Sequence, residues 1–432
     1  MGQLLKARWS PTFIDRLPRR ERRGCDYESY IPDLLADQEF QFAGTVSADI
    51  ADAESAIRVL NTEARTLTGL EGLARLLLRA EAVASSKIEG LQIGGRRLLH
   101  AEVAREFVGG PRDVTAQEVL GNIDAMAGAI DRADSVGAIE PTHLLEVHRK
   151  LVAGTRLERH GGSFRDEQNW IGGGDYSPCD AEYVPPPADQ VPGLVEDLCA
   201  FCGQDDLPAV AQAAIAHAQF ETIHPFVDGN GRTGRALIHM VLRRRGLIPR
   251  VLPPVSLVLA TLSREYIKRL MATRYVGDAS EAVARNGWND WLGFFAAASS
   301  RAVNDARFFE DRIGGLKSEW RERLGRVRRG SAMDLLIEAL PGAPVVTAKS
   351  AATLIHRSFV AANEAIGHLV AAGILRQIQI GKRNRAFEAT EVIDAFNDLE
   401  RQLASPEGDP EVSPPTRPVP APLTVTSQGS AV

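Results

Sequence analysis

Cysteine is scarce, with four residues in a chain of 432. So few thiols give no disulfide framework, and they are typical of a protein of the reducing cytosol. Cys199 and Cys202 form an isolated CxxC pair, and no further zinc ligands follow at a suitable spacing. Residues three apart share one side of a helix. We therefore predict that these two are packed helix residues rather than metal ligands.

Long apolar runs and a large net charge are missing as well. No run approaches the ~18 residues that a membrane span requires. The first ten residues, MGQLLKARWS, lack the apolar core of a signal peptide, and Lys6 departs from the myristoylation pattern. The net charge of −6 argues against a bulk polyanion-binding protein. The expected protein is cytoplasmic and makes no membrane contact.

The patterns that are present indicate a mainly α protein. Hydrophobic residues at 44% and charged residues at 25% are the balance of a soluble globular chain, and the length predicts two or three domains. Apolar residues recur at helical spacing from about 50 to 90. Further helical patterns cover residues 115–131, 141–154, 191–203, 208–223, 232–247 and 288–325. We find no internal repeat and no series of alternating strands.

Residues 161–192 differ from the helical segments on either side. Gly and Pro cluster there around short aromatic or β-branched pieces. Such punctuation predicts a loop or a short β-hairpin.

The last part of the chain predicts a winged helix-turn-helix. Three short helical patterns are followed by two short strand patterns around a Gly-Lys-Arg-Asn turn, in ILRQIQIGKRNRAFEA. Lys382, Arg383 and Arg385 cluster at this turn, but the candidate recognition helix, residues 359–370, contains no Lys or Arg. DNA readers contact phosphates with several such residues, so a protein-interaction module is favoured over DNA binding. The Pro-rich tail, 401–432, is expected to be disordered.

The stretch HPFVDGNGRTGR, residues 224–235, concentrates chemically useful groups. Its GxGxxG spacing suggests a dinucleotide fingerprint, but the preceding segment is helical and prolines stand where the acidic residue belongs. A metal-binding helix face, formed by His217, Glu221 and His224, is opposed by Pro225, because the residue before proline leaves the helical region. We interpret His217 as a core or supporting histidine instead.

A phosphate site uses every residue of this stretch. A helix is expected to end at Ile223, and a new one is expected to begin near Arg232, with its N-terminus facing an anion. Gly229 and Gly231 allow backbone N–H groups to approach phosphate closely, and Asp228 is suited to Mg²⁺. Two arginines three apart can grip a polyphosphate. His224 is the group that can accept a proton near neutral pH.

The same stretch resembles the signature of Fic (filamentation induced by cAMP) proteins, His-Pro-Phe-x-Asp-Gly-Asn-Gly-Arg-x-x-Arg, at all nine of its fixed positions. Members of that family mostly transfer AMP from ATP to a protein hydroxyl. The resemblance implies that His224 is the base, that Asp228 binds Mg²⁺ and that Phe226 packs the loop into the core. It assigns ATP binding to Gly229, Asn230, Gly231, Arg232, Thr233, Gly234 and Arg235. Within that set, Arg232 would hold the leaving pyrophosphate and Arg235 the γ-phosphate.

The upstream stretch SSKIEG, residues 85–90, would by itself be an ordinary helix end. It is similar to the inhibitory-helix motif of the same family, in the class whose inhibitory helix lies N-terminal to the catalytic loop. Ser85, Glu89 and Gly90 fit that motif. The resemblance implies that Glu89 pairs with Arg235 in the position of the γ-phosphate, so that ATP can bind only in a poor geometry.

The resemblance extends over roughly 28–395 and implies an autoinhibited protein adenylyltransferase. Its partner would be a protein whose Ser, Thr or Tyr hydroxyl docks on a flap at about 168–186, with self-modification and homo-oligomerisation left open. A nucleotide-sensing transcription regulator and removal of AMP by the same site remain as alternatives. The expected regions are a flexible N-terminus (1–27), a helical region with the inhibitory helix (28–110), a Fic catalytic domain (111–328), a winged-helix domain (329–400) and the tail (401–432).

Overall fold

The computed structural model describes residues 1–11, 24–63, 70–107, 110–111, 113–135, 137–174, 176–380 and 384–403. Helices dominate these residues, which confirms the predicted mainly α class. The helices of the body are α1 (Gly44–Glu63), α2 (Leu70–Ile88), α3 (Gly95–Ala104), α4 (Val114–Ser135), α5 (Pro141–Val152), α6 (Val191–Gly203), α7 (Ala209–Ile223), α8 (Asn230–Arg244), α9 (Val255–Thr261), α10 (Ser263–Ala272) and α11 (Ala282–Leu324).

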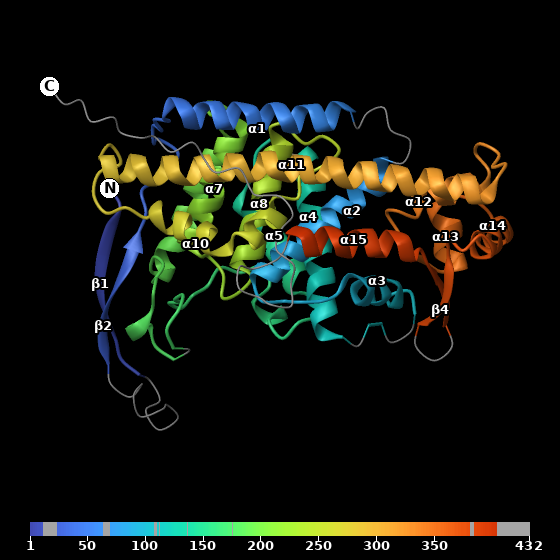
Figure 1. Ribbon diagram of the computed structural model, residues 1–432. Coiled ribbons are helices and arrows are strands. Elements are labelled where there is room, and N and C mark those ends of the chain that lie inside the picture. The colour runs from blue at the N-terminus through green and yellow to red at the C-terminus, as the bar shows by residue number, and fades with distance from the viewer. Residues whose placement is uncertain are drawn as a thin grey trace.

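Helices α7 and α8 form the centre of the molecule. Every residue of α7 is buried, and its many alanines leave room for α8 to pack closely along it. Helix α4 covers another side of α8, and α5 contacts both α4 and α8. The long helix α11 runs along most of the molecule, with α1 beside it on the outer side (Figure 1). The N-terminus of α8, where the motif lies, is thereby fixed by packing on several sides.

The N-terminal segment is more ordered than its basic composition suggested. Strand β1 (Gln3–Trp9) pairs antiparallel with β2 (Cys25–Ile31), and Figure 1 shows this hairpin at one end of the body. The prediction of a flexible segment over 1–27 was therefore wrong for the two strands, whereas residues 12–23 lie outside the described residues. The hairpin is anchored where the Tyr30 N–H donates to the Val184 carbonyl, 2.9 Å away.

A disulfide joins Cys25 of β2 to Cys179, 154 residues away along the chain. The prediction that so few cysteines give no disulfide framework therefore missed this bond. Local spacing gave no sign of it, because the two thiols meet only when the hairpin packs against the Gly- and Pro-rich segment. Cys199 and Cys202 are free and buried on α6, as the packed-helix interpretation predicted.

Past α11 the chain adds a small sheet and further helices. These elements are α12 (Ala332–Ala339), β3 (Val345–Val346), α13 (Ala348–Leu354), α14 (Phe359–Ala371), β4 (Arg376–Ile380), β5 (Asn384–Glu388) and α15 (Thr390–Leu403). The sheet has the order β3-β5-β4 with antiparallel pairs. The sequence analysis missed α15, which returns along α11 and contacts α2, α3 and α9. The predicted disordered tail begins within α15, and residues 404–432 lie outside the described part of the chain.

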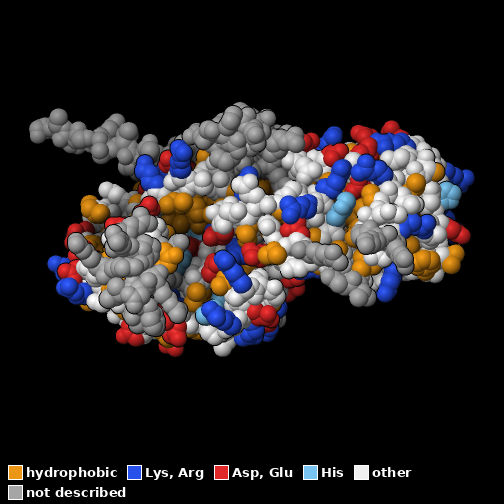
Figure 2. Space-filling model, turned by 90° about the horizontal axis from the view of Figure 1, so that it is seen from below, with side chains coloured by type: hydrophobic (Ala, Val, Ile, Leu, Met, Phe, Trp, Pro, Cys, Tyr) orange, Lys and Arg blue, Asp and Glu red, His pale blue; other side chains and the backbone are white. Residues whose placement is uncertain are grey.

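The face of the molecule in Figure 2 has no large patch of only positive or only negative side chains. At the end formed by α12–α14, Lys and Arg side chains are interspersed with Asp and Glu side chains. Among the described residues, no helix is both long enough and apolar enough to cross a membrane.

Candidate active site

The loop between α7 and α8 holds the motif. Helix α7 ends at Ile223, and His224 adopts a left-handed backbone with φ of 50°. Proline at the next position disfavours helix at His224, which explains the abrupt end. Gly229, with φ of 79°, precedes α8, which begins at Asn230, two residues earlier than expected. The first N–H groups of α8 have no partner in the preceding helical turn, so this helix start favours an anion.

Internal hydrogen bonds give the loop one shape. The Asn230 side chain accepts from the Phe226 N–H and donates to the Phe226 carbonyl, each at 2.8 Å. Phe226 is fully buried, as the family resemblance implied. Asn230 is 2% exposed, so its amide is committed to the loop and only its backbone can face a ligand.

His148 and Arg165 support this loop, and the sequence analysis identified neither. The His148 ring stacks on Phe226 at 3.9 Å between centroids. Its Nδ1 accepts the Gly162 N–H, so its Nε2 carries the hydrogen and donates to the Asp228 carbonyl, 3.1 Å away. Burial lowers the pKa of His148 to about 4, which keeps this ring neutral.

Arg165 binds the first residues of the loop through its guanidinium. Its Nε donates to the His224 carbonyl at 2.9 Å, and its Nη2 donates to the Pro186 carbonyl. Both acceptors are backbone oxygens, so the side chain joins the loop to the segment that precedes α6. Arg165 is 3% exposed, and burial lowers its pKa to about 10. No local sequence pattern marks His148 or Arg165, because each acts on a loop some 60 to 80 residues away.

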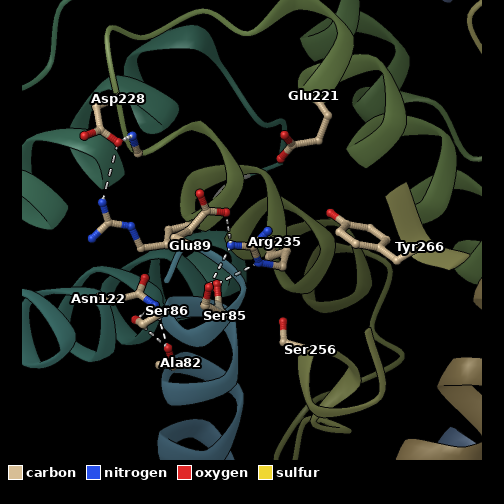
Figure 3. Close-up of polar contacts among 12 residues, drawn as sticks. Ala82, Ser85, Ser86, Glu89, Asn122, Glu221, Asp228, Arg235, Ser256 and Tyr266 are labelled. Carbon is tan, nitrogen blue, oxygen red and sulfur yellow. Dashed lines mark hydrogen bonds and ion pairs between the residues drawn. The ribbon is translucent and has the colours of Figure 1, made fainter. Parts of the chain in front are cut away.

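Helix α2 brings Ser85 and Glu89 to Arg235 of α8, as Figure 3 shows. Arg235 donates from Nε to Ser85 Oγ at 2.8 Å, and from Nη2 to the Ser85 carbonyl at 2.8 Å and to Glu89 Oε1 at 2.7 Å. The guanidinium is 1% exposed, whereas the Glu89 side chain is 34% exposed. Gly90 follows the helix in a left-handed conformation with φ of 79°.

The Glu89 carboxylate lies directly over the start of α8. A Cβ atom built on Gly231 would lie 2.0 Å from Glu89 Oε1, so only glycine leaves room for an oxygen there. Burial alone would raise the pKa of Glu89, but Arg235, Arg232 and His224 outweigh burial and lower it. The carboxylate is therefore an anion in the space where a phosphate oxygen would contact the turn.

A second set of contacts fixes the position of α2 relative to the neighbouring helices. Glu81, two turns before Glu89, is fully buried; its Oε1 contacts His239 Nε2 at 2.8 Å, and its Oε2 accepts the Ser256 N–H at 2.7 Å. The Asn122 side chain donates to the Ala82 carbonyl at 2.8 Å. These contacts anchor α2 to α8, α9 and α4, and so set the position of Glu89.

Asp228 and Arg232 lie on the open side of the turn. The Asp228 side chain is 50% exposed, and its Oδ1 lies 3.9 Å from Arg232 Nη2. An exposed carboxylate beside an anion-binding turn has the donor chemistry that Mg²⁺ prefers. The residues present therefore fit a magnesium ion that would bind together with phosphate.

The surroundings of His224 keep its imidazole neutral. Burial, followed by the positive charges of Arg274 and Arg165, lowers its pKa to about 4. A neutral imidazole can accept a proton throughout the physiological pH range.

The remaining motif residues face inward. Thr233 is fully buried, and a Cβ on Gly234 would lie 2.5 Å from Glu221 and 2.9 Å from Phe220. The Cβ side of Gly234 therefore packs against α7, and the assignment of Thr233 and Gly234 to ATP binding stays a prediction. His217 is buried and contacts the Tyr266 hydroxyl at 2.7 Å, as a supporting histidine would. Within the described ranges no group of three or more His, Cys, Asp or Glu is arranged to hold a metal.

The segment expected to form a β-hairpin flap is only minimally paired. Among the described residues of 168–174 and 176–186 it forms one antiparallel bridge, Ile171 with Tyr183, and no ladder of strands. Side-chain contacts hold it instead, because the Tyr183 hydroxyl donates to the Thr222 carbonyl at 2.7 Å and Asn169 donates to the Phe226 carbonyl at 3.1 Å. The segment thus lies beside the loop of His224.

Two family models match the chain. The Fic/DOC family model matches residues 138–242, and the Fic/DOC family N-terminal model matches residues 47–131. The first match contains the loop and all of α8 except its last two residues, and the second contains Ser85, Glu89 and Gly90.

Curated relatives match over shorter stretches. The chain is similar to protein adenylyltransferase fic-1 of Caenorhabditis briggsae, with 31% identity over 37% of this chain and 30% of that protein. It is also similar to protein adenylyltransferase Fic of Drosophila willistoni, with 37% identity over 26% of this chain and 21% of that protein. The matches thus span less than a third of the length of either relative.

Two solved structures are similar as well. A Fic family protein from Desulfovibrio desulfuricans G20 aligns with a TM-score of 0.49 and 21% identity, over 81% of this chain and 97% of that one. A segment of Fic-1 from C. elegans aligns with a TM-score of 0.44 and 22% identity, over 63% and 74% of the two chains.

Proposed function

Because the chain belongs to the Fic/DOC family, we propose that it transfers AMP from ATP to a hydroxyl side chain of a target protein. The observation that carries this proposal is the anion already present over the turn. The Glu89 carboxylate binds Arg235 and lies directly over Gly231 at the start of α8. Neutral His224 lies on the loop that precedes this helix. A phosphate group in place of that carboxylate would meet the same guanidinium and the same helix start.

The residues support an in-line transfer of AMP at the α-phosphorus of ATP. The target hydroxyl oxygen attacks the α-phosphorus, an oxygen–phosphorus bond forms, and the bond from that phosphorus to the pyrophosphate oxygen breaks. His224 takes the hydroxyl proton, as its neutral state allows. Arg232 and Arg235 stabilise the charge that collects on the leaving pyrophosphate. Alignment and charge neutralisation are the main requirements of such a reaction.

Asp228 would hold a magnesium ion, which neutralises phosphate charge when it is bound. The Asp228→Ala variant should bind ATP at least tenfold more weakly in the presence of Mg²⁺, and about equally in its absence, because only the carboxylate is lost. Calorimetric titration of wild type and variant, with and without the ion, measures both. Unchanged Mg²⁺-dependent affinity would leave Asp228 without this role.

Glu89 would restrain the reaction. While its carboxylate is bound to Arg235, the γ-phosphate has no cation to anchor it, and the α-phosphate is poorly aligned for attack. Ser85 would support the restraint, because it accepts from the same guanidinium.

The segment at 168–186 would hold the target beside His224. A backbone with one bridge and few strand partners can pair with an extended peptide, which gives weak sequence selectivity. We infer that the elements α12–β5 form the winged helix-turn-helix, and that they bind protein rather than DNA, because basic and acidic side chains alternate on the face in Figure 2.

Transfer of label tests the proposed activity. ATP labelled at the α-phosphate should label the protein itself or a target in the presence of Mg²⁺, whereas ATP labelled at the γ-phosphate should not. Label from the γ-position alone would indicate a kinase, and binding without any transfer would indicate a nucleotide sensor.

A further inference from the structure

Glu221, three residues before His224, is a second carboxyl group beside Arg235 and has no role in the reaction described above. It is 9% exposed on α7, and its Oε1 is buried with no hydrogen-bond partner among the described residues. Figure 3 shows it close to Arg235, on a different side of the guanidinium from Ser85. A buried carboxyl oxygen without a hydrogen-bond partner destabilises the folded state. A functional role would explain why it is present.

The surroundings of Glu221 keep it close to Arg235. A Cβ on Gly234, the residue before Arg235, would lie 2.5 Å from Glu221 Oε1, so the glycine provides the space that the carboxyl occupies. On its own helix, Glu221 lies 4.0 Å from His217 Nδ1. Its backbone carbonyl accepts from Arg274 Nη2 at 3.3 Å, which fixes the end of α7.

Charged and titratable groups surround Glu221 on several sides. Helix α7 contributes His217, α8 Arg235, the end of α2 Glu89, and α10 and the residues after it Tyr266 and Arg274, while the His224 ring hydrogen-bonds the Glu221 backbone. Arg235 thus has two carboxyl groups near it but hydrogen-bonds only Glu89. Burial raises the pKa of Glu221 to about 7; Arg235 and Arg274 oppose this rise, and Glu89 adds to it.

We propose that Glu221 is a positioning residue for Arg235, whose carboxylate becomes the guanidinium's counter-charge when Glu89 leaves. This inference rests on the proposed function, in which Glu89 must leave before ATP can bind productively. In the restrained state Glu89 is the ionised partner, and Glu221 is partly protonated near neutral pH. After Glu89 leaves, Glu221 loses that proton and pairs with Arg235, so the guanidinium stays in place to receive phosphate. When the negatively charged γ-phosphate binds Arg235, the pKa of Glu221 rises again. Glu221 then takes up a proton from the solvent.

Four proteins test this without any need for activity: wild type, Glu221→Gln, Glu89→Gly and the double variant. The glutamine has the same shape as the glutamate, so folding should be preserved. In the wild-type background at pH 8, Glu221→Gln should leave Tm unchanged or raise it, because a poorly paired buried charge is removed. In the Glu89→Gly background the same change should lower Tm by about 3 °C or more, because Arg235 loses its last carboxylate. The exposed Glu265→Gln change is the matched control and should be additive with Glu89→Gly.

The pH dependence gives a readout that a merely structural role would not move. A raised carboxyl pKa stabilises the fold below the unfolded value and loses that effect as pH rises through the folded value. Wild type should therefore lose stability relative to Glu221→Gln between about pH 5 and pH 8, and Glu89→Gly should not lose it relative to the double variant. If Glu221→Gln has the same effect in both backgrounds, Glu221 is not a partner of Arg235.

Proton uptake links the inference to the nucleotide. In Glu89→Gly, binding of Mg²⁺·ATP at pH 7.5 should take up close to one more proton than in the double variant, measured by calorimetry in two buffers of different ionisation enthalpy. An equal proton count would overturn the proposal even if AMP transfer occurs. The stability result stands on its own if no transfer is found, so failure of the proposed activity would be recognised separately.

Discussion

At the residue scale, two histidines near the loop between α7 and α8 have lowered pKa values. His148 of α5 contacts the loop through Nε2 and accepts the Gly162 N–H at Nδ1, whereas His224 at the loop start is the proposed proton acceptor. The pKa of each is lowered to about 4, with burial as the first cause. A lowered pKa alone therefore does not distinguish a histidine that positions the loop from one that accepts a proton. The hydrogen bonds at both ring nitrogens of His148 make that distinction.

His224→Ala should abolish AMP transfer and leave ATP binding within about twofold, because the imidazole acts on the attacking hydroxyl while the turn and the arginines bind phosphate. Transfer is measured with α-labelled ATP, and binding by calorimetry. Label transfer that persists in this variant would exclude His224 as the base.

The pH profile of kcat/KM should reflect the lowered pKa of His224. Since its pKa is lowered to about 4, the imidazole stays neutral as pH falls from 8 to about 5, and the profile should show no loss with a midpoint near 6.5. The Glu89→Gly variant is suited to this measurement because its transfer should be fast. A midpoint near 6.5 would show that the imidazole titrates like an exposed one.

At the scale of elements, helix boundaries near the motif followed from local chemistry. Pro225 ends α7, Gly229 allows the turn, and the spacing of Ser85 in the last turn of α2 and Glu89 just after it places both on one side. Those features depend on neighbours in sequence, which is why the sequence predicted them.

Other features depend on contacts between distant segments and could not be predicted in this way. Arg165 reaches the His224 carbonyl, Cys25 meets Cys179, and α15 returns along α11. Strand β1 was missed because the basic run after it dominated the composition of the first 25 residues. The contacts of Arg165 and Cys25 lie in the folded state and leave no periodic pattern in the chain, whereas α15 has helical periodicity and only its packing along α11 depends on the fold.

The disulfide between β2 and the segment before α6 should stabilise the fold substantially. In the chain-entropy model, closing a loop of 154 residues contributes about 5 kcal/mol. Cys25→Ser should therefore melt at a lower temperature than wild type without reductant, and at the same temperature as wild type with reductant. Wild type whose Tm does not respond to reductant would show that this bond makes no contribution.

At the scale of the whole molecule, the C-terminal elements share a core with the body. One continuous apolar cluster contains residues from α2, α7, α11, α12, α14 and α15. Gly72 at the start of α2 lies against Gly342 after α12, where a Cβ on Gly342 would come within 2.6 Å of the Gly72 Cα. Helix α2 thus runs from the C-terminal elements at one end to Arg235 at the other.

Gly342→Ala should therefore destabilise the protein by about 1–3 kcal/mol, because neither backbone can yield without moving α2 or α12. Gly367→Ala is the control from the same region, since nothing lies within 4 Å of its added Cβ and alanine favours helix. Denaturant unfolding measures both. Equal stability of the two variants would contradict the close packing of α2 against the C-terminal elements.

We propose that this chain transfers AMP and that Glu89 restrains the transfer through Arg235. The most direct test compares the rate of labelling from α-labelled ATP in wild type, Glu89→Gly, Arg235→Ala and the double variant, over a range of ATP concentrations. Glu89→Gly should label at least tenfold faster than wild type, because ATP replaces the carboxylate on Arg235. Arg235→Ala should be inactive with or without Glu89, since the same guanidinium serves the restraint and the substrate. If Glu89→Gly labels no faster than wild type at any ATP concentration, Glu89 does not restrain transfer through Arg235.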